Sequence, residues 1–328
     1  PIYKFKIIAT KSTVPVSTGD KIEKIIAKNK NKKLFEVVSN PEFLREGEAI
    51  RDFRYPDRII IGCNNKKIIK KMESLYMPLI KKGSVFYSTN RRGAEMIKYA
   101  SNAFLATKIS FINEMSVLCE EVGADVHAVA KGMGLDGRIG RKFLHPGPGY
   151  GGSCFPKDTQ ALVRIAQEHG VSSRIVEAVI EVNESQKARM IKKIRSALGG
   201  NERGKTIAVL GLTFKPETDD MRDAPSLAIL PKLIENGCQI NALDPQGIDE
   251  AKSLLPPEVQ YYDDVYAALD NVDAVVLMTE WNMYRNLDLD LIKLKLKRPV
   301  FIDLRNVYEP DTMKSLGFDY HCIGRFAK

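Results

Sequence analysis

The sequence lacks any apolar run of about 18 residues, the length that a membrane-spanning helix needs, because charged residues interrupt its longest apolar stretches. It also lacks CxxC pairs, and its five cysteines lie far apart. This spacing argues against a disulfide framework and against a zinc site, and it favours a reducing compartment. We therefore expect a cytoplasmic protein with no membrane segment and no bound metal, in which four of the five cysteines belong to the core.

Length and charge limit the class of protein further. The chain has 328 residues, of which 44% are hydrophobic, which is enough for two domains with an extensive core. Its formal net charge of +9 comes from lysines spread along the chain, with clusters at residues 28–33 and 66–71. These clusters alternate with Ile, Leu and Asn, a pattern more typical of a solvated helix face than of a nucleic-acid site. A positive balance suits an anionic substrate.

Short apolar strands alternate with amphipathic helices in both halves of the chain, which predicts an α/β fold with two doubly wound domains. In the first part we expect strands at residues 4–9, 35–38, 58–62 and 84–88, and helices at 18–30 and 66–80. In the last part we expect strands at 205–211, 239–243, 272–278 and 300–303, and a helix at 225–236. The glycines at 199–204 mark the clearest boundary.

A long helix is expected at residues 92–121, where apolar residues recur at helical spacing without a breaker. At 1.5 Å per residue such a helix spans about 45 Å, more than a small domain needs, so we expect it to link domains and to pack on a partner. Further helices are expected at 126–133, 158–169 and 173–198. The predicted domains are residues 1–90, 91–200 and 201–328.

The stretch from Gly149 to Asp158 combines glycines with a thiol, an amine and a carboxylate. Glycines allow positive φ and leave backbone N–H groups free to face an anion. Lys157 would favour the thiolate of Cys154, and Asp158 could act as a base or hold a water molecule. The alternative is a glycine-rich turn before a helix that begins near Asp158, with Cys154 as an inert core residue.

Six motifs in the same order resemble the UDP-glucose 6-dehydrogenase family, within the wider group of nucleotide-sugar 6-dehydrogenases, over essentially the whole chain. They are Ser12-Thr13-Val14-Pro15, the stretch from Asn40 to Gly47, the pair Lys98 and Asn102, the stretch from Gly149 to Asp158, the stretch from Gly211 to Pro216, and Asp303-Leu304-Arg305-Asn306.

The resemblance implies two Rossmann-like domains joined by a long central helix that also forms a homodimer. It further implies that the natural protein begins earlier than this sequence. The sequence starts at Pro1 without a Met, inside a predicted strand, and has no GxGxxG loop. We therefore expect an NAD-binding domain that is truncated at its N-terminus.

The activity that the resemblance implies is the oxidation of UDP-glucose to UDP-glucuronate by two NAD+, without release of the aldehyde. The alternatives are a GDP-mannose or UDP-N-acetylmannosamine 6-dehydrogenase, or a fragment that binds a nucleotide sugar but cannot transfer hydride. Cys154 resembles the family nucleophile, which forms a thiohemiacetal and then a thioester.

The other catalytic residues are implied in the same way. Lys98 would stabilise the oxyanion, with Asn102 one helical turn away and facing the same sugar. Asp158 and Thr13 would position a water molecule, and Glu42 would be the base for thioester hydrolysis. The alternatives are that Lys98 extends to the surface and that Glu42 merely caps a turn.

The resemblance also implies binding residues. Arg138 matches an arginine that reaches into the site of a neighbouring subunit. The expected substrate-binding residues are Phe43, Leu44, Arg138, Phe143, Tyr150, Gly151, Lys215 and Arg305, with Leu144 lining the same cleft. The expected cofactor-binding residues are Thr13, Glu46, Lys157 and Arg222.

Overall fold

The computed structural model describes residues 4–28 and 30–326, which form two compact units. The first unit contains the described residues up to Phe104 together with Gln160–Ser173. The second contains Leu105–Thr159 and the described residues from Arg174 onward. The three-domain division at residues 90 and 200 stays a prediction, and its outermost residues, 1–3 and 327–328, lie outside the described residues.

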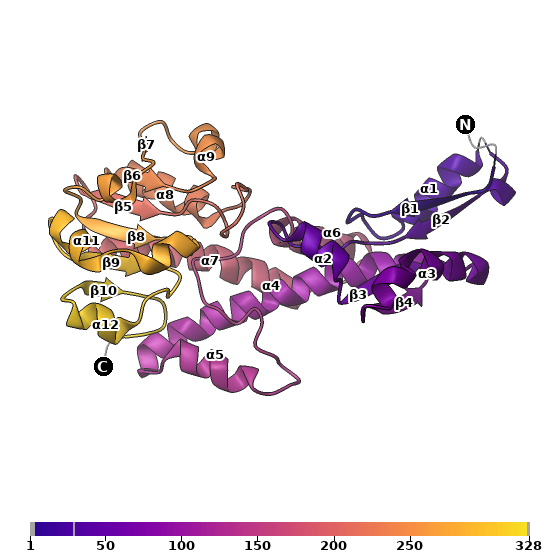
Figure 1. Ribbon diagram of the computed structural model, residues 1–328, viewed down its shortest axis with the longest axis horizontal. Coiled ribbons are helices and arrows are strands. Elements are labelled where there is room, and N and C mark those ends of the chain that lie inside the picture. The colour runs from indigo at the N-terminus through magenta and orange to yellow at the C-terminus, as the bar shows by residue number, and fades with distance from the viewer. Residues whose placement is uncertain (1–3, 29, 327–328) are drawn as a thin grey trace. The chain divides into compact units, whose positions relative to one another are not determined.

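The first unit is built on a four-stranded sheet in the order β1-β2-β3-β4 (indigo and violet in Figure 1). Its strands are β1 (Lys6–Thr10), β2 (Phe35–Ser39), β3 (Arg58–Gly62) and β4 (Val85–Thr89). β1 and β2 are parallel, as are β3 and β4, whereas β2 meets β3 antiparallel at the single pair Ser39 and Gly62.

The helices of this unit agree with the predicted pattern except in two places. α1 (Thr18–Ala27) ends earlier than predicted, and residue 29 lies outside the described residues. α2 (Ala49–Arg54) was not predicted, whereas α3 (Lys66–Ile80) has its predicted bounds. A short 3-10 turn, η1 (Lys32–Leu34), precedes β2. The core lies between α3 and the sheet, where Val38, Ile59, Ile61, Cys63, Ile68 and Met72 are buried together.

The second unit contains a six-stranded sheet in the order β10-β9-β8-β5-β6-β7, and every pairing between its neighbouring strands is parallel. This is the doubly wound order of a Rossmann fold, which reverses direction between β5 and β8. Two short edge strands, β7 and β10, were not predicted. The strands are β5 (Thr206–Leu210), β6 (Gln239–Leu243), β7 (Gln260–Tyr261), β8 (Ala274–Leu277), β9 (Val300–Asp303) and β10 (Asp319–His321).

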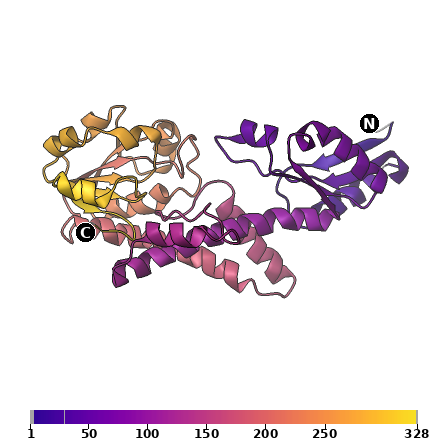
Figure 2. The same cartoon turned by 60° about the horizontal axis from the view of Figure 1, so that its bottom comes forward.

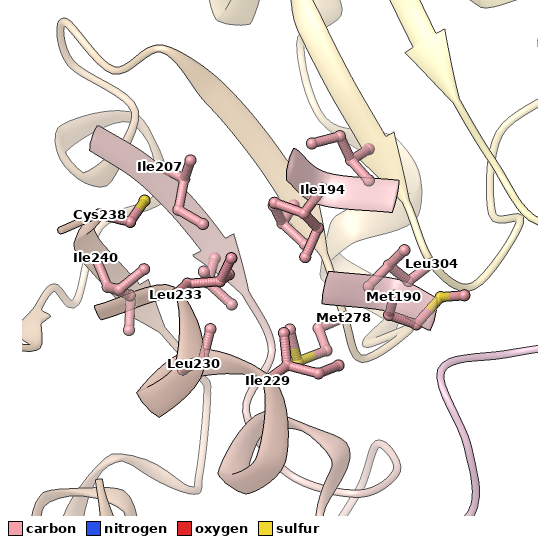
Figure 3. Close-up of a cluster of buried hydrophobic side chains, with 14 of the residues drawn as sticks. Met190, Ile194, Ile207, Ile229, Leu230, Leu233, Cys238, Ile240, Met278 and Leu304 are labelled. Atoms are coloured by element: carbon pink, nitrogen blue, oxygen red, sulfur yellow. The ribbon is translucent and has the colours of Figure 1, made fainter. Parts of the chain in front are cut away.

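Alternate residues of these strands face opposite sides of the sheet, and each side is covered by helices. On one side Ile207 and Val276 pack with α7 (Arg174–Ala197) and α8 (Pro225–Glu235), as Figure 3 shows for Ile207 with Ile194 and Leu230. On the other side the intervening strand residues pack with smaller helices. The remaining elements of this domain are α9 (Ile248–Leu254), α10 (Val265–Ala268), η2 (Asn282–Asn286), α11 (Leu289–Lys295) and α12 (Pro310–Ser315).

Two long helices support the rest of the second unit. α4 (Arg91–Val122) begins in the first unit, and its later part lies against α7 (Figure 2). Glu120 on α4 accepts hydrogen bonds from Arg189 and Lys193 on α7 and from the N–H of Gly324. Burial alone would raise the pKa of Glu120, but the Gly324 hydrogen bond and the two cations lower it below its ordinary value. α5 (Val126–Gly134) follows α4.

The start of α6 differs from the prediction in a way that matters for the site. α6 (Phe155–Glu168) begins three residues before the predicted start at Asp158. Pro156 fits here because proline suits the first turn of a helix, where its missing N–H has no partner to lose. Cys154 therefore lies directly before the helix, and Lys157 and Asp158 lie inside its first turn.

Candidate active site

The glycine-rich stretch from Gly147 to Cys154 is a loop in the second unit, buried from Gly147 to Gly152 and partly exposed at Ser153 and Cys154. Gly149 (φ 119°) and Gly152 (φ 84°) have backbone conformations that side chains rarely adopt. A Cβ on Gly152 would lie 2.7 Å from the ring of Phe214, and one on Gly151 would lie 2.8 Å from the carbonyl carbon of Asp223. The glycines therefore let this loop pass directly against the segments that follow β5.

Three buried amide side chains on α4 and α7 hold the first part of this loop. Asn183 accepts a hydrogen bond from the N–H of Tyr150 at 2.8 Å and donates to the carbonyl of Tyr150 at 3.1 Å. Asn113 accepts from the N–H of Gly147 at 2.8 Å, and Gln186 donates to its carbonyl at 2.8 Å. We call Asn113, Asn183 and Gln186 the amide clamp. Sequence reasoning missed these residues.

Cys154 is the one partly exposed cysteine, whereas Cys63, Cys119, Cys238 and Cys322 are buried. This confirms that four of the five belong to the core. Cys154 lies immediately before α6, at the end of a helix where backbone N–H groups stabilise negative charge. Its sulfur is 3.5 Å from Ser153 Oγ.

Lys157, which the sequence suggested as a partner for the Cys154 thiolate, contacts a different group. Its Nζ lies 2.5 Å from Oδ1 of Asp158, a side chain with no exposed surface. The backbone N–H of Asp158 donates to the carbonyl of Cys154 at 2.9 Å. Asp158 is thus fixed beside the cysteine by the helix and holds the ammonium that was expected to act on the sulfur.

Aromatic side chains pack beside the same loop. Tyr150 meets Phe155 edge to face with 6.0 Å between ring centroids, and Phe155 meets Phe143 at 6.1 Å. Burial raises the pKa of Tyr150 to about 12, so its hydroxyl stays protonated at neutral pH. Leu144 is buried among residues of α4 and α5. These rings give the loop an apolar border.

Arg305 joins three loops at the carboxyl edge of the six-stranded sheet. It donates to the carbonyls of Met278, after β8, and Phe214, after β5, each at 2.9 Å, and lies 3.0 Å from Glu280. This edge, at the switch between β5 and β8, is where ligands bind in open α/β sheets. Only 15% of the Arg305 side chain is exposed, so it is held in place before any ligand arrives.

The other predicted cations are less constrained. Lys215 lies 5.4 Å from the Phe214 ring centroid. Arg222 pairs with Asp220 at 2.8 Å, and its side chain is 64% exposed. Arg138 pairs with Asp136, two residues before it in sequence, and its side chain is 90% exposed. The structure thus fixes Arg305 at the sheet edge, whereas Arg138 and Arg222 reach solvent.

Asp244, directly after β6, is another residue whose role sequence reasoning missed. In dinucleotide-binding Rossmann folds an acidic residue at this place binds a ribose hydroxyl. Here Asp244 is buried, and its carboxylate accepts from the N–H groups of Leu212 and Thr213 and from Nε1 of Trp281. Asp244 therefore orders the loop after β5 instead of facing a ligand.

Lys98 and Glu42 form the corresponding cluster in the first unit. The Lys98 side chain is only 4% exposed, which excludes the alternative that it extends to the surface. Its Nζ lies 3.4 Å from Glu42 Oε1 and 5.2 Å from the ring centroid of Phe43. Glu42 Oε2 also accepts from the N–H of Leu44 at 2.6 Å. Glu42 thus caps its turn and pairs with Lys98 at the same time.

A small pocket lies beside this pair, at the ends of β1 and β2. Glu95, which sequence reasoning missed, accepts from the N–H groups of Ser17 and Gly19 and from Ser39 Oγ. It therefore occupies the N-terminus of α1. Asn102 is buried and Glu46 is half-buried in the same unit. The pocket is lined by Thr10, Ser12, Thr13, Val14, Ser39, Pro41, Glu95 and Lys98.

Within residues 4–28 and 30–326, no group of three or more His, Cys, Asp or Glu side chains could hold a metal ion. In the same described part of the chain, none of the helices is both long and apolar enough to span a membrane.

Family models match most of the chain. Residues 2–80 match the NAD binding domain of the UDP-glucose/GDP-mannose dehydrogenase family, residues 92–185 its central domain, and residues 208–310 its UDP binding domain. These matches give little support to the expectation of a truncated first domain.

Named relatives are similar over nearly the whole chain. The chain is 51% identical to a UDP-glucose 6-dehydrogenase of Rhizobium meliloti and 49% identical to one of Bacillus subtilis, covering 98% of this chain and 74% and 69% of those proteins. Among solved structures, a UDP-glucose dehydrogenase from Pyrobaculum islandicum is 36% identical with a TM-score of 0.88, covering 99% of this chain and 72% of that one.

Proposed function

Since the chain belongs to the UDP-glucose/GDP-mannose dehydrogenase family, we propose that it is a UDP-glucose 6-dehydrogenase that uses NAD to oxidise UDP-glucose to UDP-glucuronate. The observation that carries this proposal is the setting of Cys154. It is the one partly exposed cysteine, and it lies between a glycine-rich loop and the start of α6. The identity to UDP-glucose 6-dehydrogenases favours this substrate over GDP-mannose and UDP-N-acetylmannosamine.

The side chains of the first unit suit the nicotinamide end of a dinucleotide better than its phosphates. The pocket at the ends of β1 and β2 offers the hydroxyls of Ser12 and Thr13. The N–H groups that begin α1, which could bind a phosphate in other folds, are taken by the carboxylate of Glu95. We therefore assign Thr13 and Glu46 to the cofactor near its nicotinamide end. NAD, when bound, supplies the hydride acceptor for both oxidations.

Cys154 would hold the intermediate on the protein. In the first oxidation the C6 alcohol loses a hydride and a proton to give the aldehyde. The thiolate of Cys154 then adds to the aldehyde carbon, and the alkoxide takes a proton, which gives a thiohemiacetal. Loss of a second hydride and a proton gives a thioester, and water then releases the carboxylate and the thiol. The covalent bond prevents the aldehyde from leaving between the oxidations.

The remaining residues would assist these steps. Lys98, a buried cation, would stabilise the oxyanion, with Asn102 binding the same sugar. Asp158 and Thr13 would position the hydrolytic water, and Glu42 would act as its base. That residues from both units serve one reaction stays a prediction.

Binding of the nucleotide would use the second unit. Arg305 and Lys215 lie on loops at the sheet edge and would contact the diphosphate. Tyr150, Gly151, Phe143, Phe43 and Leu44 would contact the sugar. Lys157 and Arg222 would lie toward the cofactor phosphates, and Arg138, 90% exposed, would reach the site of a second subunit.

We also propose a homodimer that forms through α4. Phe104, Phe111 and Leu118 are 66%, 42% and 53% exposed, and their spacing of seven residues places them on one face of this helix. A cytoplasmic location is proposed because none of the five cysteines is paired.

The test is the amount of NADH formed per limiting UDP-glucose, measured by absorbance, with GDP-mannose and UDP-N-acetylmannosamine in parallel. We expect two NADH per UDP-glucose and little from the other sugars. One NADH would show that the aldehyde escapes and that Cys154 has another role. Two NADH per molecule of GDP-mannose or UDP-N-acetylmannosamine would show that this sugar, and not UDP-glucose, is the substrate. No NADH from any of the sugars would support the alternative that the chain binds a nucleotide sugar without oxidising it.

A further inference from the structure

The buried face of α7 carries polar residues where an amphipathic helix normally carries apolar ones. Val179, Asn183, Gln186, Met190 and Ile194 are all buried and follow one another at intervals of three or four residues, so they form one stripe along the helix. Met190 and Ile194 end this stripe in the core of the six-stranded sheet (Figure 3). The helix is therefore anchored, and its amides have fixed positions.

A buried amide without a partner destabilises a protein, so these polar residues need an explanation. Both find their partners in the backbone of the loop that leads to Cys154. Asn183 is 2% exposed and bonds both polar groups of Tyr150, and Gln186 is 4% exposed and bonds the carbonyl of Gly147. Apolar residues at these positions would remove the partners of the N–H and carbonyl of Tyr150 and of the carbonyl of Gly147. The amides therefore hold the backbone of the loop in one defined position.

The loop is also held from its other side. The N–H of Gly152 donates to the carbonyl of Arg222 at 2.7 Å, and the Phe214 ring lies against Gly152. Only three residues separate Tyr150 from Cys154, so the connection between them is short. The carbonyl of Cys154 accepts from the N–H of Asp158 in α6 at 2.9 Å. Because Tyr150, Gly152 and Cys154 are all held, the segment has little freedom, and a shift of the Tyr150 backbone changes the direction in which Cys154 enters α6.

We propose that Asn183 is a positioning residue for Cys154: its amide fixes the backbone of Tyr150 and thereby places the sulfur. Asn183 itself contacts the loop and need not touch the substrate. Gln186 has the same role with one hydrogen bond. This inference rests on the proposed function where it is tested by the kinetics of UDP-glucose oxidation. It does not rest on that function where it is tested by the alkylation rate of Cys154.

The test replaces Asn183 by leucine, which has a similar shape and removes both hydrogen bonds. Asn241→Leu is the matched control, because Asn241 is also a buried amide of this unit and donates to a backbone carbonyl, that of Ala268, at 3.0 Å. Gln186→Met is a second variant that removes a single bond. Two quantities are measured: kcat and KM for UDP-glucose, and the rate at which iodoacetamide alkylates Cys154, read by mass spectrometry.

For Asn183→Leu we expect kcat to fall on the order of 100-fold, with KM changed less than about threefold, since a shift of about 1 Å in a reacting group has this effect. Alkylation of Cys154 should slow at least threefold. Gln186→Met should lower kcat and the alkylation rate as well, but by smaller factors. If Asn183→Leu does not fold, the Gln186→Met result tests the proposal instead.

The control separates positioning from general stability. Asn241→Leu should lower the free energy of unfolding comparably but leave kcat and the alkylation rate near those of the wild type. Equal losses of kcat in the Asn183 and Asn241 variants would overturn the proposal, as would unchanged alkylation of Cys154. Failure of the wild type to oxidise UDP-glucose would instead overturn the proposed function, and the alkylation rates would still test Asn183.

Discussion

Gly151→Ala should impair catalysis by moving the loop that carries Cys154. A Cβ at this position would lie 2.8 Å from the carbonyl carbon of Asp223 and 3.1 Å from the Cα of Ala224. Carbon atoms in contact normally lie about 3.5–4.0 Å apart. The obstructing atoms are backbone, so no side chain can rotate away, and the loop must move by up to about 1 Å.

The size of the effect follows from this displacement. Overpacking of this kind costs about 1–3 kcal/mol of stability. Misplacement of a reacting group by about 1 Å costs on the order of 100-fold in rate. We therefore expect kcat to fall about 100-fold in a protein that still folds.

The assay is NADH formation at saturating UDP-glucose, combined with urea unfolding followed by the fluorescence of Trp281, the only tryptophan. Gly132→Ala in α5 is the matched control, because a Cβ there meets no atom within 4 Å and alanine favours a helix by about 1 kcal/mol. It should leave kcat unchanged and should not destabilise the protein. If Gly151→Ala retains kcat within threefold of the wild type, the loop does not position Cys154 as argued.

Three further predictions test separate contacts. Cys154→Ser should abolish acid formation but leave UDP-glucose binding, measured by calorimetry, largely intact; normal turnover would refute the assignment. Lys98→Met should lower kcat by about 100- to 1000-fold, as loss of an oxyanion partner does, and a change in KM alone would assign Lys98 to binding. The lowered pKa of Glu120 stabilises the fold above the ordinary value of 4.5, and this contribution is lost as the pH falls below it. Glu120→Gln should therefore reduce the free energy of unfolding at pH 7 more than at pH 3.5 in urea titrations.

The sequence predicted elements best where local pattern and burial agree. The bounds of β3, α3, β6 and β9 were predicted to the residue, because each is a continuous apolar or amphipathic segment between turn residues. The two-residue strand β7 was missed, since so short a segment has no period and is defined only by pairing with β6. The start of α6 was misplaced because Pro156 was not treated as a first-turn residue.

In the candidate site, too, residues in local motifs were predicted and residues with distant partners were not. Cys154 and Lys98 were predicted because they belong to short motifs. Asp244 and Glu95 were missed because their partners are far away in sequence: Glu95 bonds the N–H of Ser17, 78 residues earlier. A carboxylate that binds backbone N–H groups in another segment leaves no local pattern, so its role is visible only after folding.

Two other missed residues, Asn183 and Gln186, do leave a signal in the sequence. Asn183 and Gln186 lie at positions that the spacing of Val179, Met190 and Ile194 assigns to the buried face of a helix. Polar residues on such a face destabilise the fold unless they form hydrogen bonds, for example with the backbone of a segment distant in sequence. They therefore indicate that such a segment is held in one place. In this chain that segment leads to the one partly exposed cysteine. The buried amides of α7 thus point to the same loop as the glycines do, by an independent physical argument.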